Sequence, residues 1–149
     1  MKEGSKIKNF SAVMTGNKEF KLNDYQGKNV VLYFYPRDNT PGCTSEGEDF
    51  RDNFKSFAKK NTLIFGISKD TLKSHENFKD KFNFPFELIS DPEEKICKLF
   101  DVIKEKSMYG KKYMGIERST FLIDSNGKLA KEWRKVKLKG HVEEVLNSL

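Results

Sequence analysis

The chain has 149 residues, a length that suits one domain over residues 1–149, and 36% of them are hydrophobic, enough for a core without disulfide staples. No stretch approaches the roughly 18 apolar residues of a membrane span and no apolar leader opens the chain, so we expect neither a signal peptide nor a membrane partner. The net charge of +6 is spread along the chain and does not form a basic stripe, which argues against a nucleic-acid partner.

Turn signals and apolar runs predict alternating strands and helices in the first half of the chain. The Thr15-Gly16-Asn17 turn inside SAVMTGNKEFKLNDY predicts a β-hairpin. The continuous apolar run NVVLYFYP (29–36) is typical of a strand in the middle of a sheet. From Phe50 onward, phenylalanines at helical spacing predict an amphipathic helix that continues to about Lys60.

The second half continues the alternation and ends with a hairpin. We expect a buried strand over 62–68, a helix over 70–82 and a strand over 84–90. The Asp91-Pro92 pair should start another helix, whose apolar face contains Ile96, Leu99, Phe100 and Ile103. Ser-Asn-Gly between STFLID and KLAKEW predicts a hairpin. Alternation of charged and apolar residues in KEWRKVKLK predicts a strand with one solvent-exposed face. HVEEVLNSL predicts a final helix. This order indicates an α/β domain of thioredoxin-like fold, with a mixed central β-sheet flanked by helices and an N-terminal β-hairpin extension.

One of only two cysteines, Cys43, lies at the predicted start of a helix. Thr40 suits the N-cap and Pro41 the first helical position. A cysteine in the first turn lies near free backbone N–H groups and the positive end of the helix dipole, and both favour the reactive thiolate. Gly42 allows a small substrate to approach the backbone closely. The position therefore suits a nucleophile, whereas most free cysteines are small buried residues.

Other cysteine chemistry fits the sequence less well. There is no C-x-x-C pair, which argues against a thioredoxin-type exchange enzyme. Cys43 and Cys97 are 54 positions apart and the two histidines are isolated, so no zinc site is expected. We assign His75 and His141 to surface or capping roles, and Lys69-Asp70 to a strand-to-helix cap. So few cysteines also suggest a reducing, cytoplasmic compartment.

Residues 36–43, PRDNTPGC, match the P-x-x-x-T-x-x-C signature of peroxiredoxins, and FYPRDNTPGCTSE resembles the bacterioferritin-comigratory-protein (BCP), or PrxQ, subgroup. The similarity continues through FGIS, SHENF, SDPE and GIERSTFLID, so it covers nearly the whole chain. The resemblance implies a cofactor-free, thiol-dependent peroxidase that reduces hydrogen peroxide and organic hydroperoxides and serves antioxidant defence. From the same resemblance we expect the protein to be a monomer.

The resemblance also implies roles for individual residues. Cys43 would be the peroxidatic nucleophile and form a sulfenic acid. Thr40 would hydrogen-bond the peroxide oxygens, and Pro36 would shield the thiolate from water. Arg118, in GIERST, would be a fixed cation that stabilises negative charge as the O–O bond breaks. Glu46, one turn after the cysteine, would orient Arg118.

The route by which the sulfenic acid is resolved differs from that of many relatives. Where those relatives have a second cysteine five residues after the first, this chain has Glu48, and the helix SHENFKDKF contains no cysteine. Cys97, predicted at the half-buried flank of an apolar stripe, could be either a packing residue or the resolving thiol. We expect an external thiol from thioredoxin, glutaredoxin or glutathione. Two alternatives stay open: a thiol-disulfide oxidoreductase, and a redox sensor or holdase on the same fold.

Overall fold

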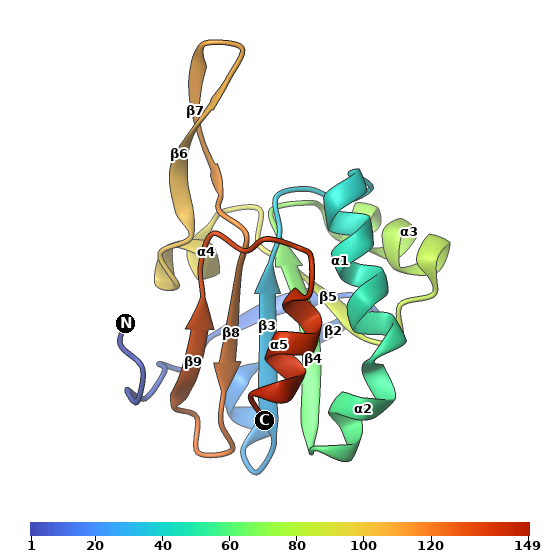
Figure 1. Cartoon of the computed structure of the whole chain (residues 1–149), viewed down its shortest axis with the longest axis vertical. Coiled ribbons are helices and arrows are strands. Elements are labelled where there is room, and N and C mark those ends of the chain that lie inside the picture. The colour runs from blue at the N-terminus through green and yellow to red at the C-terminus, as the bar shows by residue number, and fades with distance from the viewer.

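Nine strands, five α-helices and one 3-10 helix make up the computed structural model, which describes residues 1–149 (Figure 1). The strands are β1 (Ser11–Met14), β2 (Lys18–Lys21), β3 (Asn29–Phe34), β4 (Thr62–Ser68), β5 (Glu87–Ser90), β6 (Ile103–Met108), β7 (Lys111–Ile116), β8 (Ser119–Ile123) and β9 (Leu129–Trp133). The helices are η1 (Leu22–Tyr25, 3-10), α1 (Pro41–Asp52), α2 (Phe54–Lys59), α3 (Leu72–Phe82), α4 (Lys95–Leu99) and α5 (His141–Asn147). None of them is long and apolar enough to cross a membrane.

Seven strands form one mixed sheet in the order β2-β1-β5-β4-β3-β8-β9. The three neighbours β3, β4 and β5 run parallel, whereas the remaining pairs are antiparallel. Because β3 lies between β4 and β8, its residues from Val30 to Phe34 are all buried, which explains the continuous apolar run. The predictions of a mixed central sheet, an N-terminal hairpin (β1–β2) and a late hairpin (β8–β9) are confirmed.

The sheet separates two apolar layers. Side chains alternate along β3, so that Leu32 and Phe34 join one core cluster while Val31 and Tyr33 join the other. The first cluster is closed by the N-terminal segment, β1–β2, η1 and α4, and the second by α1, α2, α3 and α5. In Figure 1, α5 lies across the front of the sheet and α4 behind it.

Two predicted helices differ from the observed ones. The helix that begins at Pro41 stops at Asp52, and α2 follows after Asn53, so no single helix runs to Lys60. The helix expected from Asp91-Pro92 begins only at Lys95, and Ile103 belongs to β6. Left-handed residues at both ends, Glu94 (φ 63°) and Asp101 (φ 53°), confine α4 to one short segment.

A hairpin formed by β6 and β7 was not predicted. It pairs Ile103 with Ile116 and turns at Tyr109-Gly110, both with positive φ, and it projects from the body as a two-stranded ribbon (Figure 1). Its strands have mostly exposed side chains and many lysines, so the sequence has no clean apolar alternation there. The strand predicted for KEWRKVKLK is wrong beyond Trp133, where β9 ends; Lys135 then adopts a left-handed conformation (φ 48°).

Candidate active site

The loop after β3 delivers Cys43 to the first turn of α1. Thr40 is the N-cap residue and Pro41 the first helical residue, as predicted. The Thr40 hydroxyl, however, does not cap the helix: it donates to the carbonyl oxygen of Arg37 at 2.9 Å. Cys43 is only 1% exposed, and its side chain faces the core layer on the α1 side of the sheet.

Arg118, which lies between β7 and β8, reaches across to this turn. Its Nη2 donates to the Cys43 sulfur at 3.5 Å, and its Nη1 donates to Oε1 of Glu46 at 2.6 Å. Gly42 leaves room for this contact, because a Cβ there would lie 3.2 Å from Nη2 of Arg118 and 3.3 Å from Cδ1 of Leu138. The structure thus brings together Cys43, Arg118 and Glu46, three residues that the sequence placed in one site.

The completely buried Glu46 forms an ion pair with the partly buried Arg118. Burial raises the pKa of Glu46 to about 7, and the attraction of Arg118 only partly opposes this. Burial alone would lower the pKa of Arg118, but Glu46 and Cys43 outweigh it, so the net pKa of Arg118 is raised. Oε2 of Glu46 is buried without a hydrogen-bond partner. The arrangement keeps a permanent cation beside the Cys43 sulfur.

A groove of about 590 Å³ opens beside the site, between the loop of residues 36–40 and the β6–β7 hairpin. Pro36 and Thr40 line one side. Its hairpin side includes Lys106, Met108, Tyr113 and Met114. Burial, and then the nearby charge of Arg118, lower the pKa of Lys106. The sequence did not single out this lysine, because the hairpin that carries it was not recognised.

Cys97 lies on the other side of the sheet from Cys43. It belongs to the core layer closed by α4 and is completely buried, not half-buried at a flank as predicted. Its backbone N–H donates to Oδ2 of Asp91 at 2.8 Å. Burial raises the pKa of the Cys97 thiol, and the hydrogen bond between the thiol itself and the Asp91 carboxylate, together with the charge of that carboxylate, raises it further. Both features favour a thiol that stays protonated.

Both histidines are buried, so their assignment to surface or capping roles is wrong. His141 is hydrogen-bonded through Nε2 to Oγ1 of Thr120 at 2.8 Å, and burial lowers its pKa to about 4. His75 lies on the inward side of α3, three residues from the equally buried Phe78. The many charged neighbours of His75 in the sequence are exposed or partly exposed, which is why its burial was missed.

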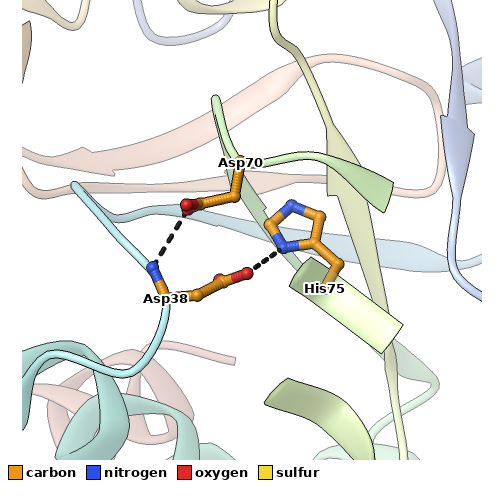
Figure 2. A group of neighbouring side chains, drawn as sticks. All are labelled: Asp38, Asp70 and His75. Carbon is orange, nitrogen blue, oxygen red and sulfur yellow. Dashed lines mark hydrogen bonds and ion pairs between the residues drawn. The ribbon is translucent and has the colours of Figure 1, made fainter. Parts of the chain in front are cut away.

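His75 belongs to a cluster with Asp38 and Asp70 (Figure 2). One potential ligand atom from each lies within 4.8 Å of the others, close enough to compare with a metal site. These atoms already have partners: Asp70 accepts from Ser68 and from the backbone N–H of Asp38, and His75 is hydrogen-bonded to Asp38. The cluster is therefore a hydrogen-bond network, and Asp70 is part of it, whereas Thr71 caps α3.

Comparison with known proteins gives concordant results. The AhpC/TSA family model matches residues 4–132. Peroxiredoxin Bcp of Bacillus subtilis is 58% identical over 129 residues, covering 87% of this chain and 82% of that protein. A mutant of Xylella fastidiosa PrxQ has a similar structure, with a TM-score of 0.95 and 44% identity over 99% of this chain and 94% of that one.

A second solved structure is that of the Xanthomonas campestris bacterioferritin comigratory protein, studied for its alkyl peroxide reduction activity. It superposes with a TM-score of 0.89 and 47% identity, covering 93% of this chain and 88% of that one. The predicted thioredoxin-like fold is confirmed by these matches. With the family model spanning most of the chain, they show that this chain belongs to the AhpC/TSA family as a peroxiredoxin of the Bcp/PrxQ subgroup, a thiol-dependent peroxidase.

Proposed function

We propose that Cys43 reduces hydrogen peroxide and organic hydroperoxides directly. The thiolate sulfur attacks the terminal peroxide oxygen, the O–O bond breaks, and the leaving oxygen takes a proton and departs as water or an alcohol. The sulfur keeps the attacked terminal oxygen with its hydrogen and becomes a sulfenic acid, two electrons more oxidised. The observation that carries this proposal is the 3.5 Å contact between the Arg118 guanidinium and the Cys43 sulfur.

The remaining residues have supporting roles in this proposal. Arg118 stabilises the negative charge that develops as the O–O bond breaks, and Glu46 fixes its guanidinium from the opposite side. Thr40 and Pro36 line the groove next to Cys43, where Thr40 would hydrogen-bond the peroxide and Pro36 would exclude water. The methionine and tyrosine side chains across the groove support the use of organic hydroperoxides as well as hydrogen peroxide.

An external thiol then reduces the sulfenic acid. It attacks the Cys43 sulfur and releases water, and a second external thiol releases Cys43 by attacking the mixed disulfide. Two observations support this route: Glu48 occupies the position of the nearby second cysteine, and Cys97 is buried in the opposite core layer. A disulfide requires the two Cα atoms to come within about 7 Å, which the intervening sheet opposes.

Thioredoxin, glutaredoxin and glutathione are the candidate reductants, and each requires a reducing compartment such as the cytoplasm. The two buried, unpaired cysteines suit such a compartment. We further infer a monomer, because elements of the same chain cover both faces of the central sheet.

The test is a titration with one equivalent of hydrogen peroxide, read by intact mass and by counting free thiols. We expect the mass of one added oxygen atom, and, when the sulfenic-acid reagent dimedone is present, a thioether adduct on Cys43 formed with loss of water. Cys43→Ser should consume no peroxide. An internal disulfide, two hydrogen atoms lighter than the reduced protein, would overturn the external-thiol route. Peroxide consumption by Cys43→Ser at the wild-type rate would overturn the role of Cys43.

A further inference from the structure

The buried side chain of Asp38 is held by several parts of the chain at once (Figure 2). The Tyr35 hydroxyl donates to Oδ1 at 2.7 Å, and the Ser74 hydroxyl donates to Oδ2 at 2.7 Å. Nδ1 of His75 lies 2.8 Å from the same Oδ2. The backbone N–H of Asp38 donates to Oδ2 of Asp70 at 3.0 Å. Residues from the end of β3, the β4–α3 connection and α3 therefore converge on one loop residue.

His75 extends this network to β5. Its Nε2 lies 2.9 Å from the carbonyl oxygen of Ile89. Because a carbonyl oxygen only accepts hydrogen bonds, Nε2 must carry the hydrogen and donate it. One further hydrogen must lie between Nδ1 and Oδ2 of Asp38, because two bare acceptors would repel at 2.8 Å. The completely buried ring thus joins Asp38 on one side to Ile89 on the other and fixes the distance between them.

The place of Asp38 in the chain makes this anchor relevant to the reaction. Asp38 lies two residues after Pro36 and two before Thr40, the residues that line the groove. The next residue, Asn39, adopts a left-handed conformation with φ 62°. A movement of Asp38 would therefore pass directly to Pro36, to Thr40 and to the start of α1, which carries Cys43.

Core stability is a poor explanation for such a cluster. Burying a carboxylate and an imidazole together costs desolvation that a well-packed apolar group avoids. A fully satisfied network is, in contrast, an effective way to hold a loop in one geometry. None of the four partners of Asp38 hydrogen-bonds to Cys43 or Arg118, so the hydrogen bonds of the network hold the loop and do not touch those two residues.

We propose that Asp38, held by His75, is a positioning residue for peroxide reduction. It fixes the loop of residues 36–40 so that Pro36 and Thr40 flank the peroxide while Cys43 attacks it. This inference rests on the proposed role of Cys43. A misplacement of about 1 Å in a positioned group can lower a rate roughly 100-fold, and an effect of this size is expected when the anchor is removed.

The test compares two reactions of the same sulfur. Oxidation by hydrogen peroxide needs Pro36 and Thr40 in place, whereas alkylation by iodoacetamide needs only an accessible thiolate. In Asp38→Ala and His75→Ala, the second-order rate of oxidation should fall about 100-fold. The rate of alkylation should change by less than about threefold. Asp38→Asn, which keeps the shape but turns one acceptor into a donor, should lower oxidation about tenfold.

Thr15→Val is the matched control. Thr15 is also buried and hydrogen-bonded, to Glu87 and to the backbone of Leu88, but it follows β1 and its side chain makes no hydrogen bond to the loop. Thr15→Val should leave the rates of oxidation and of alkylation unchanged. Parallel falls in oxidation and alkylation would reveal general damage and overturn the proposal, as would a wild-type oxidation rate in Asp38→Ala.

If Asp38→Ala does not fold, Asp38→Asn decides: a folded Asp38→Asn that reacts with peroxide at the wild-type rate overturns the proposal. A wild-type protein whose Cys43 does not react with peroxide would instead refute the proposed function. The two failures are therefore distinguishable.

Discussion

Arg118 donates a hydrogen bond to the sulfur of Cys43 at 3.5 Å, although 75 residues separate the two in the sequence. The contact joins the residue just before β8 to the first turn of α1. The other end of the guanidinium donates to the buried Glu46, so the cation cannot swing away from the sulfur without leaving a carboxyl group unpaired. This geometry resembles a preorganised electrostatic site more than a surface ion pair.

Arg118→Ala should therefore lower the second-order rate of peroxide reduction by about 100- to 1,000-fold, the usual cost of removing one preorganised donor. Arg118→Lys keeps the charge but loses the planar fork that serves two partners, so we expect a loss of at least about tenfold. Stopped-flow measurement with hydrogen peroxide gives both values. Arg134→Lys is the control, because the guanidinium of Arg134 also donates to two partners, the carbonyl oxygens of Phe100 and Asp101. This control should keep the wild-type rate. Equal rates for Arg118→Ala and the wild type would contradict the role of Arg118.

Two glycines of α1 should separate activity from stability. In Gly42→Ala the new Cβ crowds Nη2 of Arg118, so the peroxide rate should fall. The unfolding free energy should stay the same or rise by up to about 1 kcal/mol, since alanine suits a helix better than glycine. In Gly47→Ala the Cβ collides with the ring of Phe84, and overpacking should cost about 1–3 kcal/mol.

Urea unfolding and peroxide kinetics on both variants check this prediction. The folded Gly47→Ala protein should keep the wild-type peroxide rate, because its new Cβ meets the ring of Phe84 and not the guanidinium of Arg118. The opposite pattern, with the rate lost in Gly47→Ala and kept in Gly42→Ala, would show that Gly42 does not make room for Arg118.

Glu46 should make stability depend on pH. Its pKa is about 7 in the folded protein against 4.5 as the ordinary value, because burial favours the protonated form. Its contribution to stability is therefore fully present below about 4.5 and is lost as pH rises through about 7. Glu46→Gln has no titrating group at this position. As pH rises from about 4.5 to above 7, the unfolding free energy of the wild type should therefore fall relative to that of Glu46→Gln.

The comparison with Glu46→Gln matters because His141 acts in the opposite direction. Its pKa is lowered to about 4 by burial, so its contribution is present above about 6.5 and is lost as pH falls through about 4. His141 is present in both proteins and cancels in the difference. A difference that does not vary between pH 4.5 and pH 8 would refute the assignment to Glu46.

Cys97→Ala should leave turnover intact. With dithiothreitol as the reductant, the peroxidase rate should equal that of the wild type, because Cys97 lies in the other core layer. Loss of a buried sulfur should lower the unfolding free energy by about 1–2 kcal/mol, measured in urea. If turnover instead falls and the oxidised wild type contains a Cys43–Cys97 disulfide, Cys97 is the resolving thiol.

The sequence predicted those parts of the fold that depend on local patterns. The strand over 62–68 was placed with its exact bounds, because a buried strand between turn signals is unambiguous. The β6–β7 hairpin was missed because it projects from the body and exposes most of its side chains, so no apolar period marks it. Alternation of charged and apolar residues around Val136 wrongly predicted a strand there, because the left-handed backbone of Lys135 ends the extended conformation after β9.

The same distinction applies to the site. Cys43, Thr40 and Pro41 were located by a short motif and by helix-start chemistry, and Arg118 and Glu46 by the resemblance to peroxiredoxins. The contacts of Asp38 with His75 could not be predicted, because they join a loop to the inner face of a helix 37 residues away. Charged neighbours in the sequence pointed to a surface position for His75, whereas only the three-dimensional packing of α3 on the sheet shows its burial.

On the proposed external-thiol route, the position of the two cysteines on opposite faces of the sheet would also determine how long the oxidised protein persists. An internal second thiol would capture the sulfenic acid at a fixed rate, whatever the surroundings. Capture by an outside thiol is bimolecular, so the lifetime of the sulfenic acid is inversely proportional to the concentration of that thiol. During this interval a second peroxide can oxidise the sulfur to a sulfinic acid, which ends turnover. The ratio of peroxide to thiol around the molecule, and not the fold itself, then decides between repeated turnover and inactivation.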